Sequence, residues 1–381
     1  MNADHEPKRN PRPDHRRRRP RHQGRVHRLR VLVVLCLALA GCDEPPEPRS
    51  GFAGLGQEAG AYAQVERGQR LAFPRDHGAH TGYRIEWWYV TANLVDAQGR
   101  DWGVQWTLFR SALQPGAGQP GWRSADVWMG HAGLASPFGF ASDEIFARGG
   151  IGQAGVEAQP FHAWIDDWSL QSNGGEGLDK LRMQAGGQRF RYDLQLVAQG
   201  PLVLHGEQGY SEKSGQGQAS WYYSQPFYRV SGEVMHEGER VAVSGSAWLD
   251  REWSSQPLAA DQQGWDWFSL HLDSGDKLMV FQVRHDNGEH YRAGSWISAD
   301  GQAQALSGDQ IRLDAQASTA QPDGRKLPTR WRLRVPAHDV DVTAAAIEPR
   351  AWMQTSFAYW EGPVRLQGTH GGRGFLEMTG Y

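Results

Sequence analysis

The sequence predicts an all-β protein made of two tandem antiparallel β-barrel domains. Three observations predict this fold class: apolar and polar residues alternate along many short segments, glycine and tryptophan are abundant, and one pattern of strands occurs twice. The chain has 381 residues, which is long enough for two ordinary domains. Its 47 glycines and 17 tryptophans fit barrels with tight turns and aromatic interiors.

The alternating segments are bounded by Gly, Asp-Gly or Ser-Gly, which are turn signals. No segment has the pattern of a long amphipathic helix. The clearest predicted strands lie in residues 190–199, 228–248, 276–284, 330–335, 363–368 and 373–381.

The repeated pattern begins with tryptophan and an acid, continues through a strand and an Asp-to-Gly turn, and ends with a strand that closes on arginine. It occurs in residues 86–110 and again in 264–284, and the closing hairpins 222–248 and 359–381 also resemble each other. A repeat this long favours two domains of one fold.

Up-and-down strands that begin at tryptophan favour lipocalin-like (calycin-type) barrels. We therefore predict an N-terminal domain over 71–255 and a C-terminal domain over 256–381.

The first 42 residues have the pattern of a bacterial lipoprotein signal. They carry 11 Lys/Arg and 3 Asp/Glu, and their apolar run of about a dozen residues is too short to span a bilayer. The run ends in Leu-Ala-Gly-Cys42, which resembles a lipoprotein box and implies a lipid on Cys42. Asp43 resembles the inner-membrane retention signal of enteric lipoproteins. We expect a lipid-anchored protein on the periplasmic side of the cell envelope, with the inner membrane favoured.

The rest of the chain is acidic and contains no cysteine. Residues 43–381 carry 29 Lys/Arg and 40 Asp/Glu, so they lack the basic surface that nucleic-acid phosphates require. Cys36 lies in the signal and Cys42 is the predicted lipid site, which leaves no disulfide or cysteine zinc site for the folded body. Residues 43–70 are rich in Pro, Gly and acid, and predict a flexible tether.

Seven strings between Phe73 and Tyr381 are distinctive: FPRDHGAHTGYRIEWWYVTANL, GVQWTLFR, LVLHGEQGYSEKS, SWYYSQ, GSAWLDREWSSQPL, GWDWFSLHL and GFLEMTGY. Together they resemble the lipocalin-like AttH family, whose members are often described as predicted secreted hydrolases and are related to the carotenoid 1,2-hydratases. The resemblance implies a pair of lipocalin-like barrels, an exported protein, and an ABC-type export permease as a partner.

Asp250 and Glu252 are the first candidates for catalytic groups. Side chains alternate along a strand, so Trp248, Asp250 and Glu252 are expected on one face, and Arg251 and Trp253 on the other. Two carboxylates about 7 Å apart in a low-dielectric site raise each other's pKa, which suits a general acid at neutral pH. Two further acids adjoin tryptophans: Asp266 between Trp265 and Trp267, and Glu86 before Trp87 and Trp88.

A structural role is the favoured alternative for these residues. Lipocalin-like barrels close one end with an arginine packed across a tryptophan, and nearby acids would hold the guanidinium in place. The expected pairs are Arg251 with Trp253, Arg110 with Trp87 or Trp88, and Arg284 with Trp265.

The resemblance to the carotenoid hydratases implies a mechanism. A carboxylic acid protonates an isoprenoid double bond, aromatic faces stabilise the cation, and water adds. It implies Asp250 as the proton donor, with Trp248, Trp253 and Tyr223 as the aromatic groups. Those enzymes also place a histidine and a tyrosine near the acid, and the sequence alone does not locate both.

Other chemistries are excluded by their missing motifs. His77 with His80, and His285 with His290, lack a third ligand at a recognisable spacing, so no metal is expected. No P-loop or dinucleotide fingerprint occurs, and no cofactor is expected. The absence of Gly-x-Ser-x-Gly excludes an α/β-hydrolase esterase.

Two functions remain. The first, narrowly favoured, is a lipid-anchored module that binds an apolar, lipid- or isoprenoid-like ligand beside an export permease. The second is a hydratase or hydrolase that protonates such a molecule. A deep pocket reaching Asp250 or Asp266, with one acid protonated, would favour the enzyme. Barrels filled with tryptophan side chains and arginine plugs would favour the binding or structural role.

Overall fold

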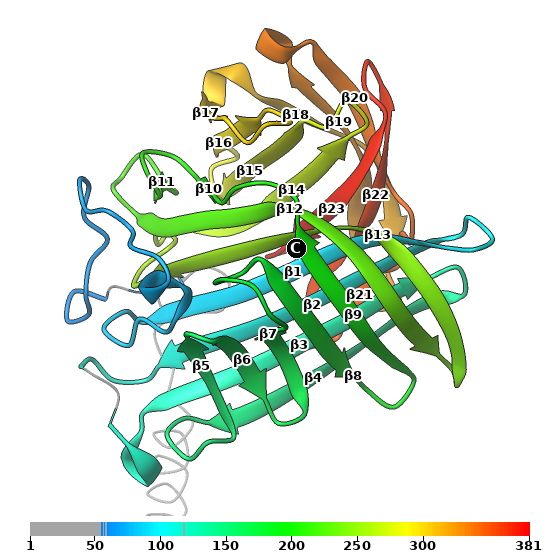
Figure 1. Cartoon of the computed structure of the whole chain (residues 1–381). Helices are drawn as coiled ribbons and strands as arrows, with labels where there is room; N and C mark the ends of the chain where they lie inside the picture. The colour runs from blue at the N-terminus through cyan, green and yellow to red at the C-terminus, as the bar shows by residue number, and fades with distance from the viewer. Residues whose placement is uncertain (1–54, 56, 58, 117–118) are drawn as a thin grey trace, which may run out of the picture. The chain divides into compact units, whose positions relative to one another are not determined.

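The computed structural model describes residues 55, 57, 59–116 and 119–381 (Figure 1). The predicted signal peptide, Cys42, Asp43 and most of the predicted tether lie outside these residues. The described end of the tether packs on the body of the protein: the Ala63 amide donates to the Gly82 carbonyl at 2.9 Å, and the Tyr62 hydroxyl donates to the Ala112 carbonyl at 2.9 Å.

Strands make up almost all regular structure in the described residues, which confirms the all-β prediction. The other elements there are four short 3₁₀ helices: η2 Arg75–His77, η3 Gly121–Arg123, η4 Gly308–Gln310 and η5 Pro336–His338. Among the described residues, no helix is long and apolar enough to cross a membrane.

In the part of the chain that the structure describes, the strands form two antiparallel sheets, one of 13 strands and one of 10 (Figure 1). The first contains β1 Ile85–Asp96, β2 Asp101–Ala112, β3 Asp126–Ser136, β4 Gly139–Arg148, β5 Ala154–Ala158, β6 Phe161–Ile165, β7 Trp168–Ser172, β8 Lys180–Gly186, β9 Phe190–Ala198, β10 Val203–Leu204, β11 Tyr210–Glu212, β12 Ala219–His236 and β13 Glu239–Ser254. The second contains β14 Gln262–Leu272, β15 Lys277–His285, β16 His290–Ile297, β17 Ala303–Ser307, β18 Arg312–Ala320, β19 Lys326–Val335, β20 Val340–Ala346, β21 Trp352–Met353, β22 Tyr359–Gly368 and β23 Gly372–Met378.

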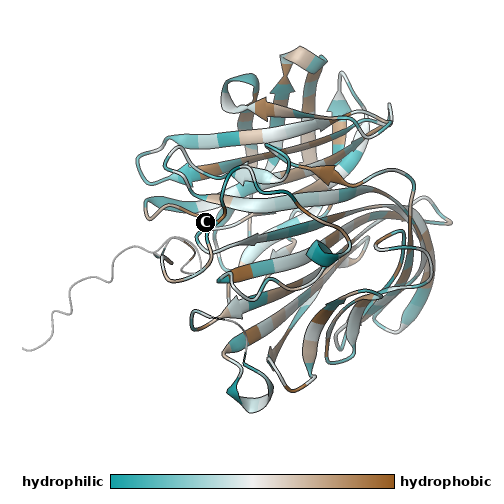
Figure 2. Cartoon of the chain, turned by 60° about the vertical axis from the view of Figure 1, so that its left-hand side comes forward, coloured by the Kyte–Doolittle hydropathy of each residue, from teal (hydrophilic) through white to brown (hydrophobic). Residues whose placement is uncertain are grey.

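The two sheets share one strand order, in agreement with the internal repeat. The first runs β4-β3-β2-β1-β13-β12-β9 and the second β17-β16-β15-β14-β23-β22-β20, so each pairs its first strand with its last. In the first sheet the order continues to β5, and β6 packs back against β2, β3 and β4, so that the sheet nearly closes. Figure 2 shows apolar and polar segments alternating along the strands, as expected where each face has different surroundings.

Three apolar cores follow from this arrangement. One fills the first barrel and contains many of the buried tryptophans, among them Trp88, Trp106 and Trp253. The second core is formed by side chains of the second sheet, among them Trp331 and Trp360. The third is formed by side chains of both sheets and comprises, with others, Tyr89, Tyr222, Trp248, Trp267, Phe281 and Phe375. This third core surrounds the candidate site.

Candidate active site between the two sheets

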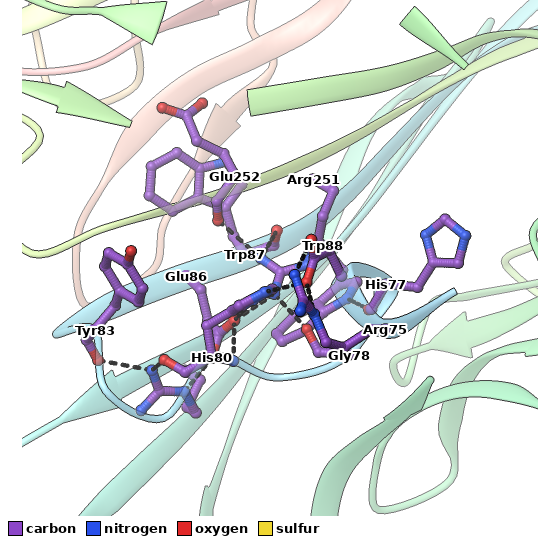
Figure 3. A network of polar contacts seen from close by, with 12 residues as sticks. Arg75, His77, Gly78, His80, Tyr83, Glu86, Trp87, Trp88, Arg251 and Glu252 are labelled. Atoms are coloured by element: carbon purple, nitrogen blue, oxygen red, sulfur yellow. Dashed lines mark hydrogen bonds and ion pairs between the residues drawn. The ribbon is translucent and has the colours of Figure 1, made fainter. Parts of the chain in front are cut away.

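Arg251 lies inside the first barrel at the centre of a polar network (Figure 3). Its guanidinium lies 3.8 Å from the ring centroid of Trp88 and 4.8 Å from that of Trp253, and it forms an ion pair with Glu86. It also donates to the Gly78 carbonyl at 2.6 Å and to His80 Nδ1 at 2.9 Å. This geometry is the arginine–tryptophan plug expected for Arg251 and Trp253.

Glu86 is the anion of this plug rather than a catalytic acid. The carboxylate is fully buried and contacts both Arg251 and Arg110. Burial opposes ionisation, but the two guanidinium charges outweigh it and hold the pKa of Glu86 far below its ordinary value.

The other two arginines make different contacts from those expected. Arg110 binds Asp126 at 2.9 Å and two backbone carbonyls, instead of packing across a tryptophan. Arg284 lies 3.9 Å from the ring centroid of Tyr381 and pairs with Asp266 at 2.6 Å. Each of these two guanidinium groups pairs with a carboxylate instead of the expected tryptophan, because a buried charge must be paired.

Asp266 is therefore an anchor for Arg284, and it lies outside the cavity described below. Its carboxylate is fully buried and also accepts from Gln282 Nε2 at 2.7 Å and from the Tyr381 hydroxyl at 2.8 Å. Its neighbours Trp265 and Trp267, in contrast, line the cavity.

Alternation along β13 separates Asp250 and Glu252 from Arg251, as predicted. Arg251 and Trp253 face the interior of the first barrel, whereas Asp250 and Glu252 face the second sheet. In Figure 3 the Glu252 carboxylate points away from the network of Arg251.

A cavity of about 190 Å³ lies between the outer face of the first sheet and the second sheet. Its walls are mainly aromatic and apolar, and a few polar groups converge on it, which is the usual composition of a small-molecule site. The aromatic lining consists of Trp87, Tyr89, Phe109, Tyr222, Trp265, Trp267, Phe281, Phe357 and Tyr359, and the ionisable lining of His131, Lys213, Asp250, Glu252 and Glu377.

Asp250 is a carboxyl group poised near neutrality. Trp248 Nε1 donates to its Oδ1 at 2.7 Å, and the Ser224 hydroxyl donates to the same oxygen. Burial raises the pKa of Asp250 to about 7; the hydrogen bonds from Ser224 and Trp248 oppose this shift, and the charge of Glu252 adds to it.

Glu377 is a second such group, contributed by the other sheet. It lies on β23 and accepts from Trp265 Nε1 at 2.7 Å. Burial raises the pKa of Glu377 to about 7 against the effect of the Trp265 hydrogen bond, and the negative charges of Asp250 and Glu252 raise it further. Because β13 and β23 are the closing strands of the two sheets, each repeat supplies one acid to the cavity.

Glu361 lies opposite Glu377 on β22 and accepts from the Tyr89 hydroxyl. Burial raises the pKa of Glu361 well above its ordinary value, and the charge of Glu377 acts in the same direction.

Glu252 differs from these acids because it has a cationic partner. Lys213 Nζ lies 3.0 Å from Glu252 Oε1 and 4.6 Å from the ring centroids of both Tyr222 and Phe281. The pair places one positive and one negative charge at the cavity wall.

His131 completes the polar wall. Its Nε2 lies 3.0 Å from Glu144 Oε1, and its Nδ1 lies 2.9 Å from the Tyr359 hydroxyl. Burial lowers the pKa of His131, although Glu144 opposes the shift. The strand register sets His131, Thr107, Tyr89 and Asp250 opposite one another in a row across β3, β2, β1 and β13.

The aromatic residues predicted beside Asp250 lie in different places. Trp248 contacts Asp250 directly, but Trp253 and Tyr223 face the interior of the first barrel, where the Tyr223 hydroxyl lies 2.7 Å from His77 Nδ1. Adjacent strand residues face opposite sides, so Tyr222 faces the cavity in place of Tyr223. Trp88 likewise lies in the barrel, whereas Trp87 lines the cavity.

Sequence reasoning missed Tyr89, Tyr222, His131, Tyr359 and Glu377. Strand alternation already pointed to Tyr89 and Tyr222, two residues beyond Trp87 and directly before Tyr223. Nothing local marks His131, because its partner Tyr359 lies 228 residues away in the sequence. No group of three or more possible metal ligands occurs among the residues that the structure describes.

The family model that matches this chain is described as AttH-like and covers residues 64–381. The chain belongs to the AttH-like family. An AttH protein from Nitrosomonas europaea, solved by crystallography, is 32% identical to this AttH-like chain, with a TM-score of 0.74 over 84% of this chain and 99% of the other. The predicted tandem lipocalin-like barrels are confirmed.

A more distant structure shares only the fold with this AttH-like chain. Kievitone hydratase from Nectria haematococca is 14% identical, with a TM-score of 0.64 over 84% of this chain and 95% of the other. No curated protein matches the sequence.

Proposed function

We propose that this protein is a hydratase-type enzyme that adds water across a carbon–carbon double bond of an apolar substrate. The observation that carries the proposal is that two carboxyl groups with pKa values raised to about 7, the buried Asp250 and the half-buried Glu377, face one aromatic cavity. Two interacting carboxyl groups that titrate near neutrality hold one proton between them over a range of pH. One then serves as general acid and the other as general base.

In the proposed reaction Asp250 transfers its proton to one alkene carbon. A C–H bond forms, the π bond breaks, and the neighbouring carbon becomes cationic. The indole faces of Trp87 and Trp267 stabilise this cation. Water attacks the cationic carbon, and Glu377 accepts the proton that the water loses. The product is the substrate plus one water molecule, and the enzyme is left with the proton on Glu377 instead of Asp250.

Two relationships support this assignment. The fold is shared with kievitone hydratase, and the sequence resembles the family related to carotenoid 1,2-hydratases. The resemblance also implies a histidine and a tyrosine near the acid. His131 and Tyr359 line the same cavity as Asp250 and are hydrogen-bonded to each other.

We prefer the enzyme to the ligand-binding module that the sequence alone favoured. A carrier of apolar molecules gains nothing from carboxyl groups that titrate near pH 7, because burying them costs free energy without adding affinity for an apolar ligand. The cavity also reaches Asp250, as expected of an enzyme that uses this acid. A lipid on Cys42, a periplasmic location and an ABC-type permease partner remain proposals that rest on the sequence.

The test is incubation of the protein in D₂O with two alkenes of different class, kievitone and lycopene. The proposal expects a product heavier by one water, with one deuterium bound to carbon. Quenching of tryptophan fluorescence reports binding independently. An alkene that binds in the cavity, but acquires neither deuterium on carbon nor water, contradicts the hydratase and supports the binding module.

A further inference from the structure

Asp250 has a chain of hydrogen-bond partners that leads away from the cavity. The Ser224 hydroxyl on β12 donates to Asp250 Oδ1. His205 Nε2 lies 2.6 Å from Ser224 Oγ, and His205 Nδ1 lies 2.9 Å from Ser295 Oγ on β16. His205, Ser224 and Ser295 are each at most 2% exposed, so these contacts are shielded from bulk water.

The chain ends at a second cleft, distinct from the aromatic cavity. This cleft has a volume of about 610 Å³, and both His205 and Ser295 line it. Its other walls include the charged residues Arg67, Glu207 and Arg292. The cleft is large enough for many water molecules and offers them the polar partners that ordered water needs.

The donor direction is the same at every step. A serine hydroxyl has one proton, so Ser224, which donates to Asp250, must accept from His205 Nε2–H. A neutral imidazole has one N–H, so His205 Nδ1 must accept from the Ser295 hydroxyl. Burial, together with the charge of Lys213, lowers the pKa of His205 to about 3, so the ring is neutral at physiological pH.

We infer that Ser295, His205 and Ser224 form a proton relay that reloads Asp250 from the second cleft. The inference rests on the proposed function, because it supplies the proton that Asp250 gives to the substrate. One proton passes from Ser295 to Nδ1, one from Nε2 to Ser224, and one from Ser224 to Asp250; a water in the cleft then restores the Ser295 proton. Glu377 releases its proton to solvent, and His205 returns to the Nε2–H tautomer before the next turnover, so protons and charge balance over the cycle.

The relay gives protons a route to Asp250 that does not pass through the aromatic cavity. A substrate that fills a cavity of about 190 Å³ excludes water from the aromatic face of Asp250. The side that faces Ser224 stays connected to the cleft while the cavity is occupied. His205 is therefore a positioning and relay residue, and it does not contact the substrate.

The relay makes a prediction that needs no substrate. Reversing all three hydrogen bonds moves the imidazole proton from Nε2 to Nδ1, so His205 should be the Nε2–H tautomer when Asp250 is ionised and the Nδ1–H tautomer when Asp250 is protonated. Histidine ¹⁵N chemical shifts distinguish the two tautomers. The charged groups nearest to Asp250 and His205 are Glu252, Glu377 and Lys213, so the assignment requires comparison with Asp250→Asn and Ser224→Ala.

The expected result is a tautomer change in the wild-type protein that Ser224→Ala and Asp250→Asn both abolish. His271 is the matched control: it is a half-buried histidine with a serine partner, Ser246 at 2.9 Å, and it should keep one tautomer. A His205 tautomer that stays fixed while Asp250 titrates overturns the relay.

Measurements of turnover provide a second test of the relay. His205→Gln keeps an N–H donor for Ser224 but cannot exchange tautomers, so kcat should fall about ten-fold or more with KM unchanged, and added imidazole should restore part of it. Unchanged kcat in His205→Gln overturns the relay. If the wild-type protein hydrates no alkene but the tautomer changes as expected, the proposed function fails and the connection between His205 and Asp250 stands.

Discussion

Asp250 and Arg251 are neighbours in sequence that serve opposite sides of the first sheet. The Arg251 guanidinium plugs the barrel against Trp88 and Trp253, whereas the Asp250 carboxyl faces the cavity shared with the second sheet. The two-residue period of a strand thus fits a structural cation and a proposed catalytic acid into one dipeptide.

Asp250→Asn should abolish most turnover while leaving the fold intact. Asparagine has the same shape and can keep the contacts to Trp248 and Ser224 after an amide flip, but it cannot donate a proton to carbon. We expect kcat to fall by about 10²- to 10⁴-fold. Steady-state kinetics and thermal unfolding measure the two effects. Asp193→Asn, which removes a half-exposed carboxylate of β9, is the control and should keep wild-type turnover.

The pH–rate profile should be bell-shaped with both limbs close to pH 7. The general acid must be protonated, so activity falls as pH rises through the upper pKa of the pair; the general base must be ionised, so activity falls as pH decreases through the lower one. Glu377→Gln should remove the acidic limb along with most of the rate. A profile that is flat between pH 5 and 9 for the chemical step would speak against the pair.

The free energy of unfolding should also depend on pH because of these two groups, and this can be measured without any substrate. Asp250 and Glu377 have ordinary pKa values of 3.8 and 4.5, raised to about 7 in the folded protein. The folded state then binds more protons than the unfolded state between about pH 4 and pH 7, so the free energy of unfolding decreases as pH rises through this window. Denaturant unfolding should show a shallower decrease for Asp250→Asn. An equal slope in both proteins would place the pKa of Asp250 near its ordinary value.

How far the sequence predicts this molecule depends on the range of each signal. Alternation and turn residues act over a few positions, and the repeat compares two segments of one chain, so the all-β class, the two sheets and the facing of Asp250 and Glu252 follow from them. The packing of one sheet on the other is not encoded locally. His131 and Tyr359 meet only because the sheets meet, and Tyr222 differs from Tyr223 only by one step of a strand.

The plug makes a separate prediction about stability. Arg251→Met fills similar space but leaves Glu86 buried with one guanidinium instead of two. We expect a loss of about 3–5 kcal/mol in the free energy of unfolding. The double variant Arg251→Met/Glu86→Gln should lose less than the sum of the two single changes, because it removes the uncompensated charge. Additive losses in denaturant unfolding would mean that the two residues do not act as a pair.

Glu252→Gln tests whether the acids of the cavity interact. The charge of Glu252 raises the pKa of both Asp250 and Glu377, and in the variant Lys213 keeps its positive charge without an anionic partner at Glu252. Both changes favour ionised carboxylates, so both limbs of the pH–rate profile should move to lower pH, by about half a unit or more. Ser307→Ala, at the rim of the second cleft, is the control and should leave the limbs in place. Movement of the limbs to higher pH in Glu252→Gln would contradict the electrostatic account, because loss of an anion beside a carboxyl group cannot stabilise its protonated form.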